Sequence, residues 1–284
     1  MRMCEDCLVC LYAQHKRLEQ SGKVQKEIAE TALAEFEKYV NTIKLSDFTP
    51  PEVASAFYNI LQRHSDIEDL YEEEKIYSTK FALAIYDEFA EKLSESKNRF
   101  EDMIKLVIAG NIIDYGADKD FTIEKARNYV AAALDKEIDI VKSEKLKSLM
   151  DQAKTIFYVA DNCGEIVFDR FLLNEYRDKI TLGIRGKAIL NDVTWKEVEM
   201  SQLGDLPIVT TEDNAPGVSL KKCGKEFLDC LYNSDLIIAK GQGNYESLHE
   251  IDRPICHLLC IKCDIMSQLV NIPKFNTYIE IRNA

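Results

Sequence analysis

The chain has 284 residues, of which 46% are hydrophobic and 30% are charged, as is ordinary for a soluble globular protein with a substantial core. Its formal net charge of −13 argues against a large nucleic-acid surface, because binding a phosphate backbone requires clustered Lys and Arg. No apolar stretch approaches the length of a membrane span, and the opening MRMCEDCLVC is too polar for a secretory signal. We therefore expect a cytoplasmic protein that binds neither nucleic acid nor membranes.

The first 150 residues have the spacing of amphipathic helices. Apolar side chains recur at helix-compatible intervals between residues 24 and 43. Residues 50–64 start with two prolines, which the first turn of a helix tolerates, and continue with an apolar face. Residues 77–93 and 121–153 have the same character. We predict an all-helical N-terminal subdomain over residues 1–150.

From residue 151 the pattern changes to short apolar runs separated by helix-like segments. Runs of this kind are typical of strands buried on both faces in a parallel sheet that is covered by helices. The predicted fold class is therefore α/β, with the helical part packed on a Rossmann-like, mostly parallel core over residues 151–284. The predicted strands are residues 156–160, 180–184, 206–210, 236–239 and 255–261.

Polar residues stand where several of these strands end. The carboxyl ends of parallel strands meet at one edge of an open sheet, and that edge is where α/β proteins bind ligands. We expect these residues to lie close together. They are Asp161 and Asn162 after the first strand, Arg185, Asn191 and Asp192 after the second, and Lys240 with Gly241 after the fourth.

The chemistry of this group favours a hard metal ion and a phosphate. Asp161, Asn162 and Asp192 offer oxygen ligands without sulfur or imidazole, which suits Mg²⁺, Mn²⁺ or a similar divalent ion. Two carboxylates and one amide leave a positive metal centre with open positions for water and a phosphate oxygen. Lys240 would neutralise a second phosphate oxygen, and backbone N–H groups after Gly164, at a helix start, would bind a third.

Each of these residues also has a simpler structural interpretation. Asp161 or Asn162 could cap the helix that begins near Glu165, an interaction worth about 1 kcal/mol. Asp192 could cap a helix in the same way, and a single lysine at a strand end is usually solvated. The coincidence of all three features at successive strand ends favours the metal site.

Two further segments carry weaker signals. GQGNYE (241–246) starts like a dinucleotide-binding fingerprint, but Glu246 stands where the third glycine belongs and the segment follows a late strand. EDNAPG (212–217) repeats the Asp-Asn pair, although its Pro-Gly dipeptide marks a turn. We expect a surface loop at residues 212–217.

Four segments and one cysteine pair match the pattern of a known family, namely DNCGEIVFD (161–169), RGKAILNDVT (185–194), IAKGQGNYESL (238–248), AGNIIDYGA (109–117) and the pair Cys4 and Cys7. Through them the chain resembles the metal-dependent damage-control phosphatases, long described as domain of unknown function 89, and in particular their prokaryotic branch with an N-terminal Cys-x-x-Cys. The resemblance implies a three-layer α/β/α core and divalent-metal-dependent hydrolysis of small phosphorylated metabolites such as sugar phosphates. It also implies magnesium, manganese, cobalt or nickel as the usable metal.

The resemblance also assigns roles to individual residues. Asp161, Asn162 and Asp192 match the metal ligands, and Lys240 matches a phosphate-contacting lysine; Asp161, Asp192 and Lys240 are the predicted catalytic residues. Asn111 and Asp114 are three residues apart and would share a helix face, either in the substrate pocket or in a polar network at a helix end. The other predicted substrate-binding residues are Gly164, Glu165, Arg185, Asn191, Gly241 and Asn244.

Nine cysteines are present, and without a signal segment buried thiols or metal ligands are expected rather than disulfides. Cys4, Cys7 and Cys10 form a C-x₂-C-x₂-C pattern, which incompletely fills a tetrahedral zinc or iron–sulfur site. A fourth ligand could come from Cys263, Cys256 or Cys260. The resemblance singles out Cys4, Cys7 and Cys263, which form a candidate second metal site; buried thiols without metal are the alternative.

The predicted activity is that of a phosphomonoesterase, in which Lys240 and backbone amides near Gly164 and Gly241 stabilise charge on the phosphate oxygens. The nucleophile could be water or an aspartate, and the absence of a D-x-D-x-T signature favours water. The alternatives are a non-catalytic sensor of a metal or phosphorylated metabolite, a sugar-phosphate isomerase or methyltransferase on the same scaffold, and a thiol-based metal chaperone. A serine hydrolase is not supported, because no G-x-S-x-G occurs.

Overall fold

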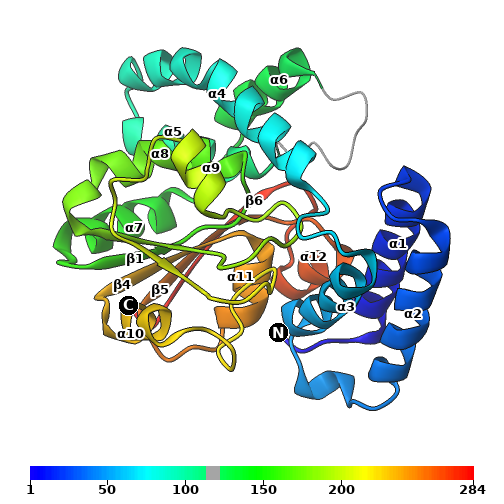
Figure 1. The fold of residues 1–284 in the computed structure, drawn as a ribbon. Coiled ribbons are helices and arrows are strands. Elements are labelled where there is room, and N and C mark those ends of the chain that lie inside the picture. The colour runs from blue at the N-terminus through cyan, green and yellow to red at the C-terminus, as the bar shows by residue number, and fades with distance from the viewer. Residues whose placement is uncertain (113–121) are drawn as a thin grey trace.

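The computed structural model describes residues 1–112 and 122–284 (Figure 1). Within these ranges a series of helices precedes a six-stranded sheet. None of the described helices is both long and apolar enough to cross a bilayer. The leading helices are α1 (Glu5–Ser21), α2 (Lys26–Val40), α3 (Pro50–Ser65), α4 (Glu72–Ser94), α5 (Arg99–Ala109), α6 (Ile123–Leu134) and α7 (Ile140–Gln152), with 3₁₀ turns η1 (Leu45–Asp47) and η2 (Gly110–Ile112).

Local sequence explains where several of these helices begin. Thr49 and Glu52 form a capping box at the start of α3, with the Thr49 N–H donating to Glu52 Oε2 at 2.9 Å. Thr122 and Asp139 accept N–H bonds at the starts of α6 and α7. These caps satisfy donors that have no partner within the helix, so each helix has a defined first turn.

The sheet confirms the predicted α/β class. Its strand order is β3-β2-β1-β4-β5-β6, and every pairing is parallel except that of the edge strand β6 with β5. The order reverses on either side of β1, so β1 and β4 flank the switch point where open α/β sheets bind ligands. The strands are β1 (Ile156–Val159), β2 (Ile180–Ile184), β3 (Ile208–Thr210), β4 (Leu236–Lys240), β5 (Ile255–Cys260) and β6 (Thr277–Arg282).

Helices cover both faces of the sheet, which confirms the predicted three layers. Phe157 and Val159 of β1 pack on one face with Phe227 of α10 (Lys225–Asn233). Ile156 and Tyr158 pack on the other face, in the cluster that includes α5, α7 and α8 (Glu165–Glu175). The remaining helices are the turn η3 (Arg177–Lys179), α9 (Trp195–Met200), α11 (Gly241–Leu248) and α12 (Asp264–Val270).

Helices α1–α3 have an apolar core of their own, and Figure 1 shows them to one side of the sheet. Phe36 of α2 and Phe57 of α3 meet edge to face there, with ring centroids 5.1 Å apart. Met103 of α5 and Met150 of α7 instead share the large cluster with the sheet. The predicted domain boundary at residue 150 stays a prediction. Helices α5 and α7 lie before that residue, yet they pack in the same apolar cluster as the sheet.

Residues 212–217 form a loop, as predicted, but the loop is not a surface loop throughout. Asn214 is 4% exposed and forms hydrogen bonds with three side chains of α3, namely Ser55, Asn59 and Gln62. The expectation of a surface loop was wrong here, because composition shows a turn but does not show what packs on it. The loop joins the α1–α3 cluster to the α/β core through polar contacts.

Candidate metal and phosphate site

Backbone pairing brings the three predicted metal ligands together at the ends of β1 and β2. Asn162 and Asp192 form an isolated antiparallel bridge, and the Val193 N–H donates to the Asp161 carbonyl at 2.9 Å. The side chains of Asp161, Asn162 and Asp192 are all buried or nearly so. The strand-end argument therefore placed these three residues correctly side by side, while their binding of a metal stays a prediction.

Arg185 lies behind the two carboxylates. Its Nε donates to Asp192 Oδ2 at 2.6 Å, and its Nη2 lies 4.0 Å from Asp161 Oδ1. Nη2 also donates to Asn244 Oδ1 at 2.9 Å, and the Asn244 amide in turn donates to the carbonyls of Ala160 and Lys240. Arg185 and Asn244 were predicted to contact substrate, and in this structure they hold the carboxylates and the two strand ends in place.

Lys240 lies below the pocket in a fully buried ionic cluster. Its Nζ donates to Glu165 Oε1 and Asp169 Oδ1, both at 2.6 Å, and to the Val107 carbonyl at 2.9 Å. An ammonium group has three donors, so all of them are engaged. A contact between Lys240 and a phosphate, as predicted from the sequence, would require one of these bonds to be exchanged.

The charges in this cluster shift one another's titration. Burial opposes the charge on Lys240, but the attraction of Asp169 and Glu165 outweighs it and raises the lysine pKa. Burial raises the pKa of Glu165 to about 8, with Lys240 opposing the shift and Asp169 adding to it. One cation against two carboxylates leaves an excess negative charge, which a shared proton would remove.

Asn111 connects this buried cluster to the predicted metal ligands. Its Nδ2 donates to Asp161 Oδ2 at 3.2 Å and to Glu165 Oε2 at 3.0 Å. Asn111 is 1% exposed, so it acts here as a buried support for Asp161. The accompanying prediction for Asp114 lies outside the described residues.

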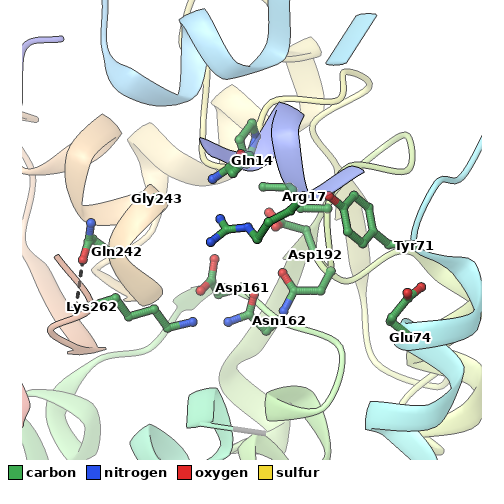
Figure 2. Close-up of a pocket in the computed structure, with 13 residues that line it drawn as sticks. Gln14, Arg17, Tyr71, Glu74, Asp161, Asn162, Asp192, Gln242, Gly243 and Lys262 are labelled. Atoms are coloured by element: carbon green, nitrogen blue, oxygen red, sulfur yellow. Dashed lines mark hydrogen bonds between the residues drawn. The ribbon is translucent and has the colours of Figure 1, made fainter. Parts of the chain in front are cut away.

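A pocket of about 350 Å³ opens above the three candidate ligands (Figure 2). Asp161, Asn162, Asn191 and Asp192 line its floor, and of the predicted site residues in the described ranges these are the ones that reach it. Gln14 and Arg17 extend over the floor from α1, and Lys262 points in from the opposite side. The other lining residues are Tyr71, Glu74, Leu190, Pro216, Gln242 and Gly243.

Sequence reasoning missed the cations of this pocket. Lys262 stands two residues beyond the end of β5, so the strand-end argument that selected Lys240 would also have found it. Arg17 and Gln14 carry no comparable signal, because helix α1 reaches the sheet edge only through tertiary packing. Other predicted residues lie behind or below the pocket and do not line it, among them Glu165, Lys240, Gly241, Arg185, Asn244 and Asn111.

The donor set fits a hard divalent cation. No three His, Cys, Asp or Glu side chains in residues 1–112 and 122–284 gather so as to hold a metal, and the candidate set instead combines two carboxylates with an amide. The amide oxygens of Asn162 and Asn191 are of the type that suits such an ion. Their side-chain nitrogens are buried without hydrogen-bond partners within these ranges, and such donors suit an anion such as phosphate.

The titration of the two carboxylates agrees with that fit. Burial raises the pKa of Asp161, against the attraction of Lys262 and Arg185. Burial also raises the pKa of Asp192 to about 7, with Arg185 opposing the shift and Asp161 adding to it. Two adjacent buried carboxylates resist being ionised together, and a bound cation would stabilise their ionised forms.

The thiols form a looser arrangement. Cys4 Sγ and Cys7 Sγ are 3.4 Å apart, whereas Cys263 Sγ accepts the Met266 N–H at 3.4 Å. Cys7 and Cys263 line a neighbouring cavity of about 640 Å³, and burial raises the pKa of Cys7 to about 12. Metal binding by Cys4, Cys7 and Cys263 stays a prediction.

A family model described as the damage-control phosphatase ARMT1-like domain matches residues 3–276. The chain belongs to this family. The match confirms the resemblance found in the sequence, and it extends over both the α1–α3 cluster and the α/β core.

Several relatives are similar to this chain along nearly their whole length. An uncharacterized protein of Methanocaldococcus jannaschii is 32% identical over 94% of this chain and 91% of its own. A damage-control phosphatase of Pyrococcus horikoshii is 30% identical over 96% of both chains, and one of Archaeoglobus fulgidus is 24% identical over 95% of this chain and 94% of its own.

The fold agrees with a solved structure of the same family. The crystal structure of a DUF89 family protein from Pyrococcus horikoshii superposes with a TM-score of 0.87 at 28% identity, covering 100% of both chains. This likeness confirms the layered architecture.

Proposed function

We propose that this protein is a divalent-metal-dependent phosphomonoesterase that hydrolyses small phosphorylated metabolites, sugar phosphates among them. The observation that carries the proposal is the convergence of Asp161, Asn162 and Asp192 on the floor of one pocket. The names of two relatives, both damage-control phosphatases, support phosphate ester hydrolysis as the reaction.

The floor residues would hold the metal. Their oxygens suit a hard ion such as Mg²⁺ or Mn²⁺, and the family resemblance adds Co²⁺ and Ni²⁺. When bound, such an ion supplies Lewis-acid polarisation of a phosphate oxygen and orients the reacting groups. The pocket volume of about 350 Å³ is at the small end for a ligand site, which suits a metabolite of sugar-phosphate size.

The residues around the floor keep its geometry fixed. Arg185 partly compensates the charge of Asp192, and Asn111 orients Asp161 from below. The ionic cluster of Lys240, Glu165 and Asp169 joins the end of β4 to α8, the helix that begins three residues after Asn162, so it holds the segment that carries Asp161 and Asn162. A floor held in this way is preorganised for charge that develops on the phosphate.

The test is metal add-back to protein stripped with chelator. Mg²⁺, Mn²⁺, Co²⁺ and Ni²⁺ are returned one at a time, and phosphate release is followed from p-nitrophenyl phosphate and a panel of sugar phosphates. We expect at least one ion to restore turnover, and Asp161→Ala to abolish it. Asp178→Ala removes an exposed carboxylate of η3 and should behave as the wild type.

The alternative is a sensor that binds a metal and a phosphorylated metabolite without turnover. Calorimetry with each ion distinguishes the two. Metal binding that requires Asp161, together with no phosphate release under any condition, would favour the sensor and refute the phosphatase.

A further inference from the structure

The basic residues selected by the strand-end argument do not reach the pocket. All three donors of Lys240 are engaged below it, and Arg185 is 1% exposed, with Nε and Nη2 bonded to Asp192 and Asn244. A phosphate dianion on the floor of the pocket would therefore take its cationic partners from other lining residues, which in the described ranges include Lys262 and Arg17.

Helix α1 provides such a cation. Leu11, His15 and Leu18 are its buried face, which turns Gln14 and Arg17 toward the pocket. Figure 2 shows the Arg17 side chain extending over Asp161 and Asp192. Arg17 is exposed, and within the described part of the chain it has no hydrogen bond or ion pair with another residue. Its five donors are thus available to a ligand in the pocket.

We propose that Arg17 binds the phosphate group of the substrate, and this rests on the function proposed above. Asp161, Asp192, Arg185 and Lys262 together carry no net charge, and a divalent ion would bring the total to two positive charges. A phosphomonoester brings a charge close to −2 at neutral pH, which this set can balance. Arg17 is therefore favoured by its position over the floor and by its donors, which are unengaged within the described residues. Arginine suits that place because its planar fork binds two phosphate oxygens at once.

The experiment compares Arg17→Gln and Arg17→Lys with Lys16→Gln. Lys16 is the exposed neighbour in α1 that does not line the pocket, so its substitution changes the net charge equally. Calorimetry measures the binding of Mn²⁺ alone and then of inorganic phosphate to Mn²⁺-loaded protein. Steady-state hydrolysis of p-nitrophenyl phosphate gives kcat and KM separately.

We expect Arg17→Gln to weaken phosphate binding at least about tenfold and to raise KM in parallel, with Mn²⁺ binding no weaker than in the wild type. Arg17→Lys should fall between, because it keeps the charge and loses the fork. Lys16→Gln should stay within about twofold of the wild type in all measurements.

The result that overturns the inference is phosphate binding by Arg17→Gln equal to that of the wild type and of Lys16→Gln, in protein with the wild-type melting temperature. A wild type that binds no phosphate also overturns it. A wild type with no turnover, but with phosphate binding that depends on Arg17, would refute the proposed hydrolysis and support the assignment of Arg17.

Discussion

A Cβ atom placed on Gly241 would lie 1.7 Å from Oδ2 of Asp161. Gly241 begins α11 directly after β4, and its φ of +73° is in the left-handed region. Gly241 was predicted from the sequence to act through its backbone amide. The structure adds that the missing side chain provides the space for the Asp161 carboxylate.

Replacing Gly241 with Ala should therefore displace Asp161 from the floor of the pocket. We expect phosphate release to fall on the order of 10²-fold, because a catalytic group moved by about 1 Å loses its alignment. Mn²⁺ binding measured by calorimetry should weaken as well.

Gly22 offers a matched control for this substitution. It has the same φ of +73°, but no atom lies within 4 Å of where its Cβ would be. Gly22→Ala should incur the backbone strain alone, about 1 kcal/mol of unfolding free energy, and keep full metal binding and turnover. Equal losses in the two variants would mean that backbone strain, and not contact with Asp161, explains the effect.

Replacing Lys240 with Met should destabilise the fold. Glu165 and Asp169 would remain buried without their cation, and breaking a buried ion pair from one side typically costs about 3–5 kcal/mol. Urea unfolding at pH 7 measures the change. Lys221→Met removes a lysine whose side chain is 69% exposed and should change the unfolding free energy by less than about 1 kcal/mol. A Lys240→Met protein of wild-type stability would show that the buried charges are not compensated by this lysine.

His257 should make the protein sensitive to acid. It is fully buried in β5, neither ring nitrogen has a hydrogen-bond partner in the described ranges, and burial lowers its pKa to about 3. The unfolded chain binds a proton near pH 6.5 and the folded chain does not, so stability is lost as the pH falls from about 6.5 toward 3. The slope from this residue is at most about 1.4 kcal/mol per pH unit.

The check on this prediction is His257→Phe, which keeps a ring beside Tyr245, whose centroid lies 4.9 Å away. Urea unfolding at pH 7 and pH 5 should show a smaller loss for the variant than for the wild type. The same loss in both proteins would mean that other groups cause the acid sensitivity.

Asn214→Ala should weaken the junction between the loop at residues 212–217 and helix α3. The substitution removes the donor to the side-chain oxygens of Asn59 and Gln62, which should cost about 1–3 kcal/mol of unfolding free energy. Asn128→Ala, at an exposed position of α6, should stay within about 0.5 kcal/mol. Thermal or urea unfolding decides between a structural junction and an incidental contact.

The sequence predicts most of the sheet because its inner strands are continuous apolar runs. Strands β1, β2, β4 and β5 lie close to the predicted ranges. Strand β6 was not predicted. It is an antiparallel edge strand in which only Ile279 is buried, so it lacks the continuous apolar run that marks the inner strands. The predicted helix at residues 24–43 is shorter in the structure, where α2 runs from Lys26 to Val40.

Only the part of the site that directly follows the strands could be predicted from the sequence. Strand ends gave the position of Asp161, Asn162 and Asp192, because chain direction fixes which edge they occupy. The same argument located Lys240 but could not show that its side chain turns down toward Asp169. Arg17 lies on a helix far away in sequence, and only the packing of α1 brings it to the pocket.

The pocket lies where two separately packed units meet. Its floor is built on the large apolar cluster of the sheet, and Arg17 and Gln14 belong to the helices of the α1–α3 cluster. Separately packed units can open with different free energies, which amide hydrogen exchange measures. An anion held by both units would link their opening, so saturating phosphate should slow exchange in α1–α3 more than in β1 and β4. Occupancy of this small pocket would then set how cooperatively the whole chain unfolds.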